Sequence, residues 1–159
     1  MIVVKDGNRV IKFSGEKIAH STSYDRGKAR WIEFNLFITD GGNYVLSRIG
    51  ASRLVHTVPC STVERNKIKE APANDVECDN AVICSECQSL ERGTSTVVYP
   101  EVPRYWASVS DCAESVVDHL YKEDYNGNRY MTDVAKRLLE EALKKDPHIA
   151  DAYLTEYID

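Results

Sequence analysis

The chain has 159 residues, of which 43% are hydrophobic and 28% are charged, and its formal net charge is −5. These values are typical of a globular protein and unlike those of collagen-like, coiled-coil or disordered chains. The length is sufficient for one hydrophobic core, so we expect a single domain over residues 1–159. No apolar run is long enough to span a membrane, and Met1 to Lys12 does not resemble a secretory signal. We therefore expect a cytoplasmic protein that does not enter a membrane.

Charge is distributed unevenly along the chain. Residues 1–100 contain 13 Lys and Arg against 12 Asp and Glu, whereas residues 101–159 contain 7 against 13. An acidic C-terminal third repels nucleic-acid phosphate and suits a basic partner surface. A solvated helix surface can have the same composition, so charge alone does not decide between the two interpretations.

Residues 1–55 predict an antiparallel β-meander. Asp6-Gly7-Asn8 has the sequence of a hairpin turn between two apolar runs. Strong alternation over Arg30–Thr39 predicts a strand with one buried face, formed by Ile32, Phe34, Leu36 and Ile38. Further strands are predicted over Ile2–Lys5, Arg9–Ser14, Lys17–Ser23 and Tyr44–Ile49.

Residues 56–93 predict an irregular insertion that carries cysteines, and residues 94–159 predict a last strand, Thr94–Tyr99, followed by helices. The predicted helix starts are Asp111, which forms a capping box with Glu114, then Thr132, and then Asp146 before Pro147. The last helix is expected to end near Ile158. Strands followed by about three helices indicate an α+β fold, with the helices packed on one face of a sheet of five to six strands.

Residues 12–49 contain Phe13-Ser14-Gly15 before a strand and the alternating segment Arg30–Thr39 before a glycine-rich turn. This stretch resembles an uncharacterised actinobacterial family called EXLDI, although the motif for which the family is named is absent from the sequence. The resemblance implies a shared β-meander, and it carries over no activity and no functional residue.

The cysteines suggest a structural zinc site. The spacing Cys84-x-x-Cys87 allows both sulfurs to reach one tetrahedral Zn²⁺. The remaining ligands would be His56 and Cys60, or Cys60 and Cys78. Zinc sites of this kind usually contain two such close pairs and this sequence contains one, so a set of buried and surface thiols is the alternative.

Cys112 is a candidate nucleophile, because a thiol in the first turn of a helix has a lowered pKa. His119 is two helical turns further on and too distant to act as its base. The spacing to Val116 and Leu120 instead predicts that Cys112 belongs to the core.

No other catalytic constellation is evident in the sequence. His20 is expected to share a strand face with Ile18 and Thr22 as a structural residue, and no phosphate-binding loop occurs. We therefore predict no catalytic residues.

Two surfaces are candidates for binding a partner. Arg26, Lys28 and Arg30 belong to a basic N-terminal segment that suits nucleic acid. Tyr153 and Tyr157 are four residues apart on the last helix, next to Asp151 and Glu156. We expect this tyrosine row, which includes Ile149, to be partly exposed, and the row Ala150, Leu154 and Ile158 to pack inward.

The leading hypothesis is a non-catalytic interaction or regulatory module whose acidic, tyrosine-bearing helical face binds a partner protein or a second copy of the chain. The first alternative is a small zinc-stabilised module that binds nucleic acid, and the second is an enzyme with an unrecognised thiol site.

Overall fold

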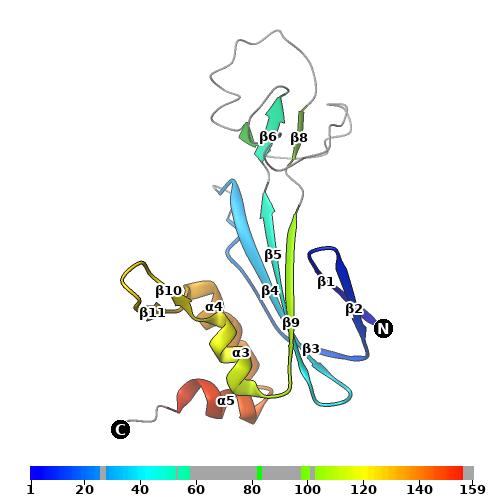
Figure 1. The fold of residues 1–159 in the computed structure, drawn as a ribbon, viewed down its shortest axis with the longest axis vertical. Coiled ribbons are helices and arrows are strands. Elements are labelled where there is room, and N and C mark those ends of the chain that lie inside the picture. The colour runs from blue at the N-terminus through cyan, green and yellow to red at the C-terminus, as the bar shows by residue number, and fades with distance from the viewer. Residues whose placement is uncertain (26–27, 53, 58–81, 84–97, 101–102, 156–159) are drawn as a thin grey trace. The chain divides into compact units, whose positions relative to one another are not determined.

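The computed structural model describes residues 1–25, 28–52, 54–57, 82–83, 98–100 and 103–155 (Figure 1). They divide into two units. The first comprises residues 1–23, 33–49 and 105–159, and the second comprises residues 24–32 and 50–104, each within the described ranges. Strands dominate the N-terminal part and helices the C-terminal part, so the predicted α+β class is confirmed.

Four strands form an antiparallel sheet, which we call the central sheet. Its strands are β3 (Gly15–Thr22), β4 (Arg30–Thr39), β5 (Tyr44–Ser52) and β9 (Arg104–Ser110), in the order β3-β4-β5-β9. The glycine-rich turn after β4 is as predicted: Thr39 N–H donates to Asn43 O over 2.8 Å, and Gly42 has a φ of 85° that glycine adopts without strain.

The N-terminal hairpin forms a sheet of its own instead of extending the meander. It consists of β1 (Ile2–Asp6) and β2 (Arg9–Phe13), with Gly7 at a φ of 58° in its turn. The hairpin covers one face of the central sheet: the Phe13 and Phe37 rings meet edge to face, with centroids 5.3 Å apart. The buried residues of this cluster are Val4, Phe37, Val45 and Ala107.

Both faces of β4 are therefore buried in its middle, which the sequence alternation did not predict. Phe34 and Leu36 are buried on the expected face, and Phe37 is buried on the opposite face under the hairpin. Ile32 and Ile38 were expected to be buried on the same face, but both are only partly buried.

The helical layer consists of α3 (Ala113–Leu120), α4 (Asp133–Leu143) and α5 (Pro147–Leu154). In Figure 1 the helices gather on the side of the sheet opposite the β1–β2 hairpin. A short hairpin of β10 (Lys122–Glu123) and β11 (Arg129–Tyr130) joins α3 to α4.

Two of the three predicted helix starts are confirmed. The Thr132 side chain accepts from Ala135 N–H, and the Asp146 side chain accepts from His148 N–H, with Pro147 at the first helical position. The capping box at Asp111 was wrong, because extended backbone makes Cys112 the N-cap of α3, without a side-chain cap bond. The last helix is also shorter than predicted, since the extended residue Thr155 ends it.

Helix α4 covers the open edge of β3. The Glu141 side chain accepts from His20 N–H at 3.5 Å, and Arg137 Nη2 donates to Thr22 O at 3.1 Å. Polar side chains thus pair backbone groups that an edge strand leaves free.

A β-bulge in the same strand corrects the prediction for His20. The register of β3 against β4 shifts between Lys17 and Ala19, so that Ile18 is buried whereas His20 is exposed. His20 Nε2 lies 3.1 Å from Glu33 Oε1 of β4.

The second unit contains a three-stranded sheet of order β7-β6-β8. Strand β6 (Leu54–Thr57) pairs in parallel with β7 (Val82–Ile83) and antiparallel with β8 (Val98–Pro100). Strand β8 overlaps the end of the predicted strand Thr94–Tyr99, whereas most of the predicted insertion lies outside the described residues.

Candidate functional site

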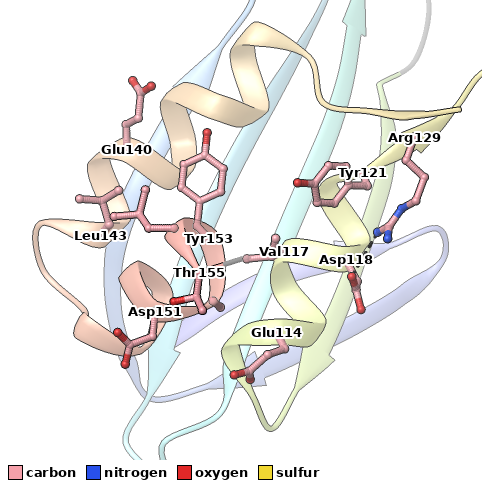
Figure 2. Close-up of a pocket in the computed structure, with 12 residues that line it drawn as sticks. Glu114, Val117, Asp118, Tyr121, Arg129, Glu140, Leu143, Asp151, Tyr153 and Thr155 are labelled. Carbon is pink, nitrogen blue, oxygen red and sulfur yellow. Dashed lines mark hydrogen bonds and ion pairs between the residues drawn. The ribbon is translucent and has the colours of Figure 1, made fainter. Parts of the chain in front are cut away.

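The three helices and the β10–β11 hairpin surround an open groove of about 950 Å³, which we call the helical groove (Figure 2). Its apolar part comes from Val117 of α3, Leu143 of α4, and Ala152 and Leu154 of α5. The remaining lining residues are Glu114, Asp118, Tyr121, Arg129, Glu140, Asp151, Tyr153 and Thr155.

The charges of the helical groove are predominantly negative. Glu114 and Asp118 come from α3, Glu140 from α4 and Asp151 from α5, so each helix contributes at least one carboxylate. Among the described residues that line the groove, Arg129 is the one cation. Several like charges around one depression attract a cationic ligand more strongly than the same charges spread over a surface.

Arg129 reaches into the groove from the β10–β11 hairpin. Its guanidinium lies over the Tyr121 ring, 4.4 Å from the centroid, and its Nη2 donates to Asp118 Oδ1 at 3.2 Å. Figure 2 shows the three side chains together at one end of the groove. One cation thus contacts an aromatic face and a carboxylate at the same time, a combination that favours guanidinium.

Tyr153 lines the helical groove from α5 and is half-buried. Its burial raises the pKa of the phenol above the ordinary value of 10.0, and the neighbouring Glu140 and Tyr121 raise it further. The ring is therefore neutral at physiological pH and offers an apolar face together with a hydroxyl group.

The orientation of α5 differs from the prediction. Ile149 is fully buried and Leu154 is 67% exposed, so Ile149 and Leu154 have exchanged the inward and outward positions expected of them. Helix α5 packs against both α3 and α4, so the face of α5 that contains Ile149 is the one turned toward those helices. Tyr153 is partly exposed, as expected, and Ile158 lies outside the described residues.

The structure brings some of the predicted partner-binding residues together. Asp151 and Tyr153 both line the helical groove, whereas Glu156 and Tyr157 lie outside the described residues. The groove also contains residues that the sequence analysis missed, from other elements: Glu114, Asp118, Tyr121, Arg129 and Glu140. The acidic excess of the last third was the available signal for Glu114, Asp118 and Glu140.

The predicted zinc site cannot be located in the structure. Cys60, Cys78, Cys84 and Cys87 lie outside the described residues, and of His56 only the backbone, in β6, is described. Within the described part of the chain, no three His, Cys, Asp or Glu side chains converge in a way that could hold a metal ion. Zinc binding therefore stays a prediction, which elemental analysis of the purified protein can test.

The predicted basic surface lies in the second unit. Lys28 and Arg30 are exposed there, while Arg26 lies outside the described residues. Beside them the Tyr24 and Trp31 rings pack edge to face, with centroids 4.9 Å apart.

Cys112 is not part of the core, contrary to prediction. It is exposed, because as the N-cap it precedes the helical stripe to which it was assigned. The His119 ring lies 5.7 Å from that of Trp106 on β9, centroid to centroid.

None of the helices in the described ranges is long and apolar enough to cross a membrane. Comparison of the chain with family models, with curated proteins and with solved structures found no match.

Proposed function

We propose that this protein is a non-catalytic interaction module, and that its helical groove binds a basic segment of a partner protein. The observation that carries the proposal is the composition of the groove, in which carboxylates of three helices surround two tyrosines and one arginine. A basic segment would complement this charge, and the tyrosines would supply rigid contact area.

An exposed apolar residue beside the charges supports the same proposal. Leu154 is 67% exposed and lines the groove, next to the half-buried Tyr153. Apolar side chains at the centre of an interface contribute affinity, whereas the surrounding charges mainly increase the association rate and the specificity. The expected ligand therefore combines Lys or Arg with at least one apolar side chain.

The experiment is a titration of fluorescently labelled peptides against the purified full chain, followed by anisotropy. A basic peptide that contains leucine should bind, and its affinity should fall as salt is added, because surface charges are screened. A peptide of the same length with Glu in place of the basic residues should not bind.

A pair of variants assigns the binding to the groove. The double variant Glu140→Gln/Asp151→Asn removes two exposed groove carboxylates. It should weaken binding about threefold to thirtyfold, as expected for losing two exposed charge contacts. The control Glu16→Gln/Asp40→Asn removes two exposed carboxylates on β3 and the β4–β5 turn, and it should bind like the wild type.

Equal weakening by both double variants would contradict the groove as the binding site. Binding of a DNA or RNA oligonucleotide in place of the peptide would favour the nucleic-acid alternative, in which Arg26, Lys28 and Arg30 contact phosphate.

A further inference from the structure

The β10–β11 hairpin places the backbone of Arg129 at one end of the helical groove. In the turn between β10 and β11, the Asp124 side chain accepts from Asn126 N–H and Asn128 N–H, both at 2.9 Å, and Gly127 has a φ of 83°. The turn therefore has an ordered conformation, and the strand that follows it directs Arg129 onto Tyr121 and Asp118.

The contact that Arg129 makes can be exchanged readily. The Arg129 and Asp118 side chains are 56% and 71% exposed. Water and salt screen an ion pair in this position, so it adds little to the stability of the fold. Arg129 is thus a weakly held occupant of an aromatic–carboxylate site.

The rest of the groove offers similar chemistry. Glu140 lies near Tyr153, Asp151 lines the groove from α5, and within the described part of the chain neither carboxylate forms an ion pair. In Figure 2 the Tyr121 and Tyr153 side chains lie on opposite sides of the groove and Arg129 approaches from the Tyr121 side.

We propose that the helical groove recognises arginine, and that Arg129 is an internal substitute which an arginine of the partner displaces from Tyr121 and Asp118. This proposal rests on the proposed function and names the side chain that the groove selects. Arginine is favoured over lysine because its planar guanidinium can stack on a tyrosine ring while its N–H groups donate to a carboxylate. The compact ammonium group of lysine gains less from stacking.

The test compares two peptides that differ only in having arginine or lysine at each basic position. Wild-type protein should bind the arginine peptide about threefold to tenfold more tightly, as expected for one or two exposed stacking contacts. The variant Arg129→Gln should bind the arginine peptide at least about threefold more tightly than the wild type, because the internal competitor is gone.

A charge-matched control separates displacement from a general gain in negative charge. Lys122→Gln removes one positive charge from the same hairpin, and Lys122 is exposed and does not line the groove. Its affinity for the arginine peptide should stay below that of Arg129→Gln. The variant Tyr121→Leu should bring the affinities of the two peptides close together, and circular dichroism verifies that each variant is folded.

Failure of this inference is distinguishable from failure of the proposed function. If both peptides bind the wild type equally well, or if Arg129→Gln and Lys122→Gln have the same affinity, arginine selection by displacement is wrong and the interaction module stands. If neither peptide binds any of the proteins, both proposals are wrong.

Discussion

At the scale of single residues, Tyr44 and Asp146 connect the central sheet to the helical layer. The Tyr44 hydroxyl donates to Asp146 Oδ2 over 2.5 Å, and both residues are more than nine-tenths buried. The other carboxylate oxygen accepts from His148 N–H at the start of α5. One carboxylate therefore caps α5 and attaches it to β5.

The variant Tyr44→Phe should lower the free energy of unfolding by about 1–3 kcal/mol, because it leaves Asp146 Oδ2 buried without its donor. Urea denaturation followed by circular dichroism measures this loss. The control is Tyr125→Phe, because Tyr125 is 97% exposed and loss of its hydroxyl leaves no buried polar group without a partner. A loss at Tyr44 no larger than at Tyr125 would contradict the assigned role.

The same contact predicts how stability depends on pH. Burial raises the pKa of Tyr44 above its ordinary value of 10.0, and the hydrogen bond to Asp146 adds to the shift. The folded state therefore binds this proton more tightly than the unfolded state, so the contribution is complete below about pH 10 and is lost as the pH rises further. Above about pH 10, wild-type stability should fall more steeply with pH than that of Tyr44→Phe. Parallel curves for the two proteins would refute this account.

Leu154 provides a test of binding without a change in folding. Because its side chain is 67% exposed, Leu154→Ser should change the free energy of unfolding by less than about 0.5 kcal/mol. Affinity for the basic peptide should fall about fivefold, as expected when roughly 1 kcal/mol of apolar contact is lost. The matched control is Val3→Ser on β1, at a position 54% exposed and remote from the groove lining. If both variants bind the basic peptide with equal affinity, Leu154 does not contact the peptide.

At the scale of elements, the close pairing of β3 with β4 depends on a glycine. Gly15 pairs with Thr39, and a Cβ at position 15 would lie 2.2 Å from Ile38 O and 2.8 Å from Thr39 Cα. Both are backbone atoms, so the strands would have to shift to accommodate a methyl group.

Gly15→Ala should therefore lower the free energy of unfolding by about 1–3 kcal/mol, the usual cost of adding a methyl group to a tightly packed site. Gly41→Ala is the control, because a Cβ there would meet nothing closer than 3.8 Å and the residue lies in the adjacent turn. Thermal unfolding of the wild type and the two variants measures this loss. Equal melting temperatures for all three proteins would contradict the prediction.

Local patterns in the sequence predicted some elements well and others poorly. Strand β4 and the helix start at Thr132 were predictable, because alternation and capping depend on neighbouring residues. Strand β9 was missed, since the adjacent Tyr105 and Trp106 break the alternation and its place beside β5 depends on residues more than fifty positions earlier. The bulge that exposes His20 likewise exists only in the pairing of two strands.

At the scale of the whole first unit, the central sheet has an apolar layer on each face. Phe37 is 6% exposed beneath the β1–β2 hairpin, on the face opposite the helices. Phe37→Ala should therefore destabilise the protein by about 3–5 kcal/mol, the range for a buried phenylalanine. Chemical denaturation measures the effect, and a loss below about 0.5 kcal/mol would mean that the hairpin does not cover this face in solution.

The sequence by itself determined the α+β class, the position of most strands and helices, and an acidic C-terminal third with tyrosines. These features follow from periodicity, turn chemistry and composition, which act over short stretches of chain. The tertiary structure alone decided that Asp118, Glu140 and Asp151 line one groove, that Arg129 lies over Tyr121, and that Leu154 faces outward. The groove and the outward position of Leu154 depend on how the three helices pack together, and the contact of Arg129 with Tyr121 depends on the β10–β11 hairpin. The residues come from separate elements, so no pattern within one element encodes the distance between them.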